Sequence, residues 1–198
     1  MRVSQDEKDR SHARIVAAAA RIVREQGIEG ASVTEVMSEA GLTHGGFYRH
    51  FADKDALADE AIAFAFGQIL AALRSRFEEN DPATAAMDFQ KYYLSEGHVA
   101  NPGMGCPVAA LAGEIGRGGT ALKKTFGEGV GRLIRQFAAG MPGSDAARRA
   151  KATREVAMMA GAVMIARASD PDTAREVLLA CRPSERRGPR SGDGSAQA

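Results

Sequence analysis

The sequence predicts an all-α protein, with a small N-terminal helical domain joined to a larger helical domain. Alanine-rich stretches recur along the 198 residues, and alanine favours helix because it loses no side-chain entropy there. Apolar residues repeat at spacings of three and four, the pattern of a helix with one buried face. The length and the hydrophobic content of 44% allow one sizeable core and a second, smaller unit.

The first predicted helix follows a polar segment, residues 1–11, which we expect to be frayed. Gly27 is a typical residue to end this helix, because glycine readily takes the left-handed conformation found after a helix. The apolar positions of the predicted helix lie on one face: Ile15, Ala18, Ala19, Ile22 and Val23.

Two short helices separated by a tight turn come next. Ser32 and Glu35 form a capping box that begins one helix, and Gly41 supplies the turn after it. Thr43 is expected to cap the following helix, whose inner side carries Phe47 and Phe51. A short helix, a tight turn and a second short helix form the helix-turn-helix arrangement.

Further helices follow from capping and turn residues. Asp53 is expected to cap a helix that runs to about residue 77, and Asp81-Pro82, Cys106-Pro107 and Asp170-Pro171 each place proline at a first helical position. We predict further helices over 120–139 and 145–168, a loop over 101–105, and a disordered tail over 183–198 that is rich in Ser, Gly, Pro and Arg.

The segment over residues 14–62, and above all GLTHGGFYRHFADKDAL, resembles the helix-turn-helix domain of the TetR family. The resemblance implies a DNA-binding domain over 11–71, with its recognition motif at about 32–53. It also implies an effector-binding and dimerisation domain over 72–182. The function implied is that of a sequence-specific transcriptional regulator, usually a repressor that a ligand releases from its operator, with activation left open.

Adjacent glycines in the recognition segment favour close approach to DNA. Gly45 and Gly46 each weaken an isolated helix by about 1 kcal/mol relative to alanine, which makes sense if the backbone must come close to a phosphate or a base edge. His44 stands where the family commonly has lysine. The DNA-contacting residues that the resemblance implies are Ser32, Thr34, Thr43, His44, Gly45, Tyr48, Arg49, His50 and Lys54.

Lys54 falls in the first turn of its predicted helix, where the positive end of the helix dipole disfavours a cation. A phosphate docked at this helix end would reverse that penalty.

The second domain is expected to sense an apolar or electrophilic effector. Plain core packing is an alternative for every candidate lining residue: Met87, Tyr92, Tyr93, Met104, Cys106, Phe126, Val130, Phe137 and Met158. Cys106 is predicted at a helix N-terminus, which lowers the pKa of a thiol and so favours the reactive thiolate. Our hypothesis is that alkylation of Cys106 weakens operator binding. A small buried structural residue is the alternative for this cysteine.

We expect a homodimer, because one recognition helix covers few base pairs and such proteins read two half-sites. The resemblance places the dimer surface on the last two helices. The expected interface residues are Val156, Met159, Ala160, Val163, Met164, Val177 and Leu178.

Composition argues against other classes. The net charge is +1, and the first sixty residues hold eight Lys/Arg against eleven Asp/Glu, so any DNA contact must come from a local surface. No phosphate loop, HExxH or nucleophile elbow occurs, and we expect no cofactor or metal. The alternatives are a helical enzyme with a Cys106–His98 dyad and an effector-independent DNA-binding protein. We expect a cytoplasmic protein without membrane contact, since the N-terminus is polar and no apolar run reaches about 20 residues.

Overall fold

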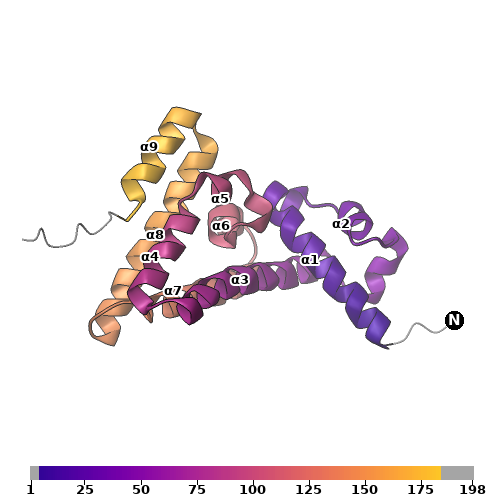
Figure 1. Cartoon of the computed structure of the whole chain (residues 1–198). Coiled ribbons are helices and arrows are strands. Elements are labelled where there is room, and N and C mark those ends of the chain that lie inside the picture. Colours follow the sequence, from indigo (N-terminus) through magenta and orange to yellow (C-terminus); the bar gives the residue numbers. More distant parts are fainter. Residues whose placement is uncertain (1–4, 184–198) are drawn as a thin grey trace, which may run out of the picture.

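The computed structural model of the protein describes residues 5–183, and every regular element in that range is helical (Figure 1). The elements are α1 (Gln5–Gly30), α2 (Val33–Glu39), the 3-10 helix η1 (His44–Arg49), α3 (Lys54–Glu79), α4 (Pro82–Tyr93), α5 (Glu96–Ala100), the 3-10 helix η2 (Pro102–Met104), α6 (Pro107–Arg117), α7 (Thr120–Ala138), α8 (Asp145–Ala168) and α9 (Pro171–Cys181). The predicted all-α class is confirmed. The tail predicted over 183–198 lies outside the described residues apart from Pro183.

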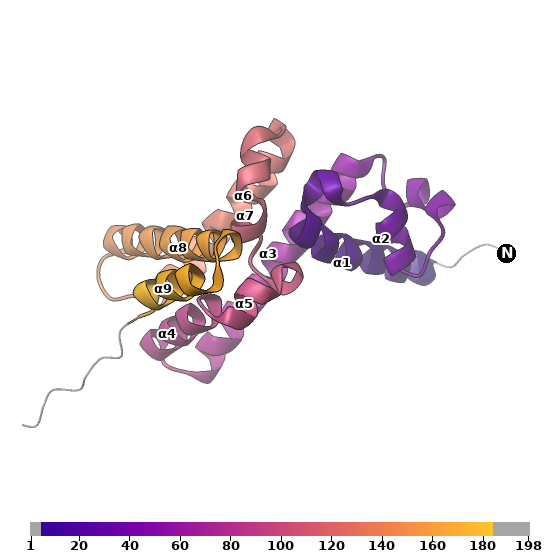
Figure 2. The ribbon, with the colours of Figure 1, turned by 90° about the horizontal axis from the view of Figure 1, so that it is seen from above.

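The N-terminal elements form one end of the molecule, and α8 and α9 form the other (Figures 1 and 2). Helix α3 runs between the two ends and packs against α1 in the first domain and α7 in the second. It is long and apolar enough to cross a membrane. Its buried side chains, including Ala61, Phe66 and Leu73, instead form part of the protein core, as core helices often do.

Helix α1 is longer than the sequence predicts. It begins at Gln5, so residues 5–11 are helical rather than frayed, and Asp6 and Glu7 in its first turn favour the positive end of the helix dipole. The predicted stop at Gly27 is a kink, where φ is 84°, and one further turn continues to Gly30. Only glycine adopts that conformation without strain.

The predicted helix caps are present. The Ser32 hydroxyl accepts the N–H of Glu35 at 3.1 Å, and the Asp53 carboxylate accepts the N–H of Ala56 at 2.8 Å. Thr43 is the exception, since its side chain makes no capping hydrogen bond and the helix after it is a 3-10 helix. Short length and two glycines favour this tighter form over an α-helix.

Helix α5 was not predicted, because Gly97 and its five-residue length hide the helical pattern. Ser95 was the available signal, since its hydroxyl accepts the N–H of His98 at 3.1 Å and so caps the helix. The predicted loop over 101–105 contains the single 3-10 turn η2.

The inward face of α8 differs from the prediction. Val156, Met159, Ala160 and Val163 are buried in the chain's own core, as is Leu178 of α9, so they are not free to meet a second subunit. The prediction was wrong for these residues because helical spacing identifies an apolar face without saying what covers it. The large apolar side chains that α8 and α9 expose are Met158, Met164, Ile165 and Leu179.

Candidate DNA-binding surface and the buried cluster around Cys106

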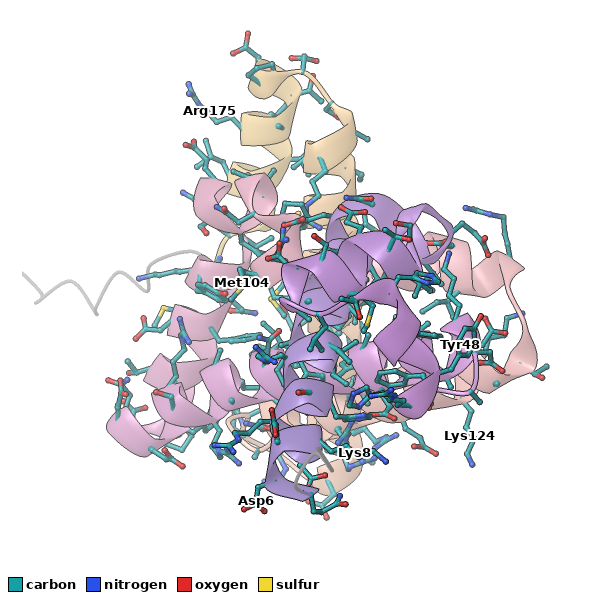
Figure 3. The ribbon with its side chains drawn as sticks, turned by 90° about the vertical axis from the view of Figure 1, so that its right-hand side faces the viewer. Asp6, Lys8, Tyr48, Met104, Lys124 and Arg175 are labelled. Atoms are coloured by element: carbon teal, nitrogen blue, oxygen red, sulfur yellow. The ribbon has the colours of Figure 1, made fainter. Side chains whose placement is uncertain are left out.

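The 3-10 helix η1 is an exposed element held by two buried aromatic side chains. Phe47 and Phe51 are almost fully buried, and their ring centroids are 5.7 Å apart. Tyr48 lies between them in sequence but is 74% exposed, and its ring forms a T-shaped pair with the ring of Phe47. It lies on the same side of the molecule as Lys8 of α1 (Figure 3). Folding alone gives no reason for a large aromatic side chain to stand in water here.

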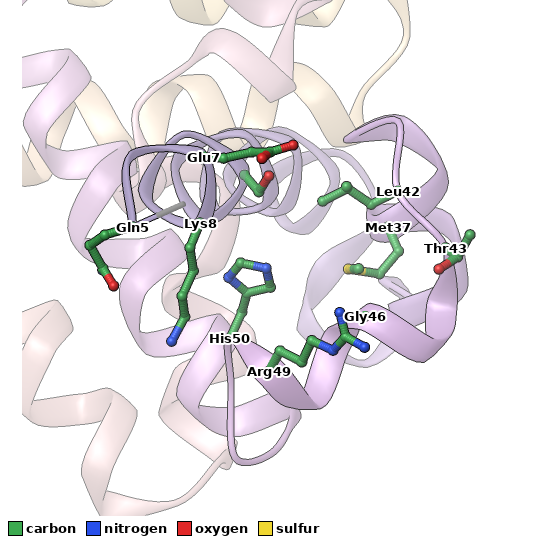
Figure 4. Close-up of a pocket in the computed structure, with 10 residues that line it drawn as sticks. Gln5, Glu7, Lys8, Met37, Leu42, Thr43, Gly46, Arg49 and His50 are labelled. Carbon is green, nitrogen blue, oxygen red and sulfur yellow. The ribbon is translucent and has the colours of Figure 1, made fainter. Parts of the chain in front are cut away.

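A hollow opens between the N-terminal part of α1 and η1 (Figure 4). Lys8, Ser11, Arg49 and His50 are among the residues that line it. The Nδ1 atom of His50 is buried and has no hydrogen-bond partner among the described residues. Burial lowers the pKa of His50, and the nearby His12, Lys8 and Arg49 lower it further. The sequence did not predict Lys8 and Ser11 at this surface, because residues 1–11 were expected to be frayed.

The Cys106 thiol is completely buried in the second domain. Burial raises its pKa and outweighs the Tyr93 hydroxyl and the N–H groups of Val108 and Ala109, all of which favour the thiolate. The helix N-terminus therefore acts in the predicted direction, but desolvation is the larger effect, and the prediction of a lowered pKa was wrong. The buried Tyr93 hydroxyl has no geometrically satisfactory hydrogen bond within residues 5–183.

Two arginines from different parts of the chain lie beside the buried cluster of Tyr93, His98 and Cys106. Arg24 of α1 is buried and donates to the Gly105 carbonyl at 2.9 Å and to Gln68 Oε1 at 2.7 Å. Burial lowers the pKa of its guanidinium to about 10. Arg167 of α8 donates to the His98 carbonyl at 2.8 Å and is half-buried. The residue before Cys106 is thus tied directly to the N-terminal domain.

A sequence model described as "Bacterial regulatory proteins, tetR family" matches residues 15–61, the segment that holds most of α1, α2, η1 and the start of α3. The matched segment belongs to the TetR family. Proteins with this domain are DNA-binding transcriptional regulators and not enzymes, and the chain has that function through this segment. A comparison with curated proteins found no match.

Solved structures of other regulators share the TetR fold over almost the whole chain. A TetR-family regulator from Cytophaga hutchinsonii has a TM-score of 0.73 at 21% identity, over 92% of this chain and 95% of that one. The reduced form of Escherichia coli NemR has a TM-score of 0.71 at 15% identity, over 87% and 95% of the two chains. SCO4454 from Streptomyces coelicolor gives 0.68 at 20% identity, over 87% and 92%.

Within this TetR domain, most of the predicted DNA-contacting residues lie on the surface. The exposed ones are Ser32, Thr34, Thr43, His44, Gly45, Tyr48 and Arg49. His50 and Lys54 are half-buried, and the Lys54 ammonium donates to the Glu29 carbonyl at 3.0 Å. Ser32 also serves as the cap of α2, so its hydroxyl is already engaged.

The predicted effector residues of the TetR regulator divide into three groups. Tyr93, Cys106 and Phe137 are fully buried in the second domain, whereas Met104 and Met158 are exposed on η2 and α8 and do not line an interior. The half-buried members are Met87, Tyr92, Phe126 and Val130.

The geometry also argues against a Cys106–His98 dyad. His98 Nδ1 is 2.6 Å from the Tyr93 carbonyl, to which it must donate, and Nε2 accepts the backbone N–H of Cys106 at 2.9 Å. Both ring nitrogens are therefore occupied, and burial lowers the pKa of His98. No group of three potential metal ligands is found within residues 5–183.

Proposed function

We propose that this TetR-family regulator binds its operator as a homodimer through η1 and neighbouring residues, and that occupation of the second domain or modification of Cys106 releases it. The observation that carries the DNA-binding part is the 74% exposed Tyr48, which stands on a short helix anchored by buried Phe47 and Phe51. A rigid base with an exposed aromatic and polar surface suits contact with the major groove and its phosphates.

The subunits pair through α8 and α9 in this proposal. Met158, Met164 and Ile165 expose apolar surface on the outer side of α8, and Leu179 does so on α9 with 55% exposure. An exposed apolar patch of this kind favours association, because contact removes it from water. Two such helices from each subunit would form a four-helix interface and set the spacing of the two recognition helices.

The response to an effector is proposed to centre on Cys106. Its thiol is buried and its pKa raised, so a reagent reaches it only through a local opening of the second domain. A group added to the sulfur would not fit a site that is fully packed, and the segment would have to move. A regulator with the same fold, E. coli NemR, is described as a reduced form, which supports testing the redox and alkylation chemistry of Cys106.

Selection of genomic DNA fragments by the purified protein tests the DNA-binding part. Recovery of a common, two-fold symmetric sequence is expected, and Tyr48→Ala should bind that sequence at least about fivefold more weakly, since a contact worth 1 kcal/mol changes Kd about fivefold. Failure to recover any sequence would contradict the proposal.

Alkylation of Cys106 tests the release mechanism with the recovered operator. The Cys181→Ser variant leaves Cys106 as the single thiol of the chain. Complete alkylation, checked by mass spectrometry, should weaken operator binding in this variant, whereas Cys106→Ser should keep its affinity under the same treatment. Unchanged affinity after complete alkylation of Cys106 would rule out this form of release.

A further inference from the structure

Glu114 of α6 holds the end of α1 by two backbone hydrogen bonds. Its carboxylate accepts the N–H of Ile28 at 2.8 Å through Oε2 and the N–H of Glu29 at 2.8 Å through Oε1. The break at Gly27 turns these groups into the first donors of a new helical turn, which a negative side chain stabilises. A Cβ atom at Gly27 would lie 2.8 Å from Glu114 Oε2, so glycine also leaves room for the carboxylate.

The same turn also holds the Lys54 side chain. The Lys54 ammonium donates to the Glu29 carbonyl at 3.0 Å, so Glu29 accepts from Lys54 through its C=O and donates to Glu114 through its N–H. Lys54 begins α3, directly after the recognition segment. The Glu29 carbonyl that accepts from its ammonium partly offsets the unfavourable position of a cation at a helix N-terminus.

Helix α6 is tied to α1 at both of its ends. At the first end, Arg24 bonds the Gly105 carbonyl, one residue before Cys106. At the second end, Glu114 bonds Ile28 and Glu29. Gly105 lies 81 residues from Arg24 in sequence, and Glu114 lies 86 residues from Ile28. These contacts join the second domain to the turn that holds Lys54.

We propose that Glu114 is a positioning residue for operator binding, which acts through the Ile28–Glu29 turn to hold Lys54 where it meets a phosphate. The inference rests on the proposed function, in which Lys54 contacts the DNA backbone. An ammonium already held near its bound position loses less side-chain freedom when DNA binds. A carboxylate in the second domain thereby sets the affinity of a contact in the first.

A double-mutant cycle between Glu114 and Lys54 tests this inference on the full-length protein with the operator recovered as above. With two subunits on the DNA, Glu114→Ala should raise Kd by at least about fivefold, because immobilising one long side chain costs about 0.5–1.5 kcal/mol. In the Lys54→Met background the same substitution should have almost no further effect. Glu128→Ala on α7 is the matched control, since Glu128 is an exposed carboxylate that takes no part in the hydrogen bonds to Ile28 and Glu29, and the Kd of this variant should stay at the wild-type value.

The salt dependence of binding checks the role of Lys54 separately. Lys54→Met should reduce the slope of log K against log salt concentration by about two for the dimer, at roughly 0.9 for each phosphate lost. Glu114→Ala should leave the slope unchanged, because the lysine can still reach its phosphate from a less ordered start.

The possible outcomes separate the two proposals. If the wild-type protein binds no operator, the proposed function fails. If it binds and Glu114→Ala matches the Glu128→Ala control, or weakens binding equally with and without Lys54, the positioning role is overturned. Should Glu114→Ala fail to fold, Glu114→Gln replaces it in the cycle, since the amide oxygen keeps one acceptor. Glu114→Gln should then raise Kd by less than Glu114→Ala would, and this rise should disappear in the Lys54→Met background. If the effects of Glu114→Gln and Lys54→Met on the binding free energy simply add, the positioning role is again overturned.

Discussion

Replacement of Gly45 by alanine should strengthen the fold and weaken DNA binding in the same molecule. Gly45 is exposed within η1, and its φ lies outside the positive region that requires glycine. A Cβ atom built there meets no described heavy atom within 4 Å. The free protein therefore gives no steric reason for glycine, and the helical backbone favours alanine.

The size of both effects follows from this geometry. Alanine in a helical position is more favourable than glycine by roughly 0.5–1 kcal/mol, which raises Tm by about 1–4 °C for a chain of this length. An extra methyl group in a closely packed contact costs about 1–3 kcal/mol, which corresponds to a rise in Kd of roughly fivefold to 150-fold. Gly45→Ala should stabilise the fold and at the same time weaken DNA binding only if DNA covers the surface of η1 in the complex.

Thermal unfolding and operator titration measure the two effects on one preparation. Gly127→Ala is the matched control, because Gly127 is exposed on α7 and its added Cβ atom also meets nothing within 4 Å. The control should gain stability by a similar amount and keep its DNA affinity. Wild-type affinity in Gly45→Ala, with the expected rise in Tm, would refute the reasoning that this glycine makes room for the duplex.

Three further predictions concern the second domain. Ile165→Asp should shift the protein from dimer to monomer in sedimentation, because Ile165 is 51% exposed on the outer side of α8, and an unchanged dimer would exclude this face. At pH 7, N-ethylmaleimide should modify Cys181 at least about tenfold faster than Cys106, whose thiol is buried with a raised pKa, and equal rates in single-cysteine variants would contradict that burial. Burial lowers the pKa of His98, so the unfolded state binds a proton at this residue more tightly than the folded state does. The free energy of unfolding should therefore fall as the pH drops below about 6.5 and level off below the pKa of the folded state. His98→Gln should flatten this pH dependence.

Much of the site could be predicted because its signals are local. The pair of Phe47 and Phe51 beside a polar Tyr48 identifies an anchored, exposed helix within five residues of sequence. Lys8 escaped prediction because nothing in a polar N-terminal segment indicates that α1 extends to Gln5 and brings its first turns beside η1. The burial of Cys106 escaped prediction for a related reason, since the groups that enclose it come from α1, α4, α5 and α8.

The sequence by itself determined where most of the helices begin and which segment resembles a DNA-binding helix-turn-helix. Helix caps such as Ser32 and Asp53 act on N–H groups within three residues, and the periodicity of apolar side chains describes one helix at a time. Only the tertiary structure decided that Val163 faces inward and Ile165 outward, that desolvation outweighs the helix N-terminus at Cys106, and that Glu114 meets Ile28. Burial and long-range hydrogen bonds depend on which elements pack together, and the local pattern around a residue does not specify its partners from distant parts of the chain.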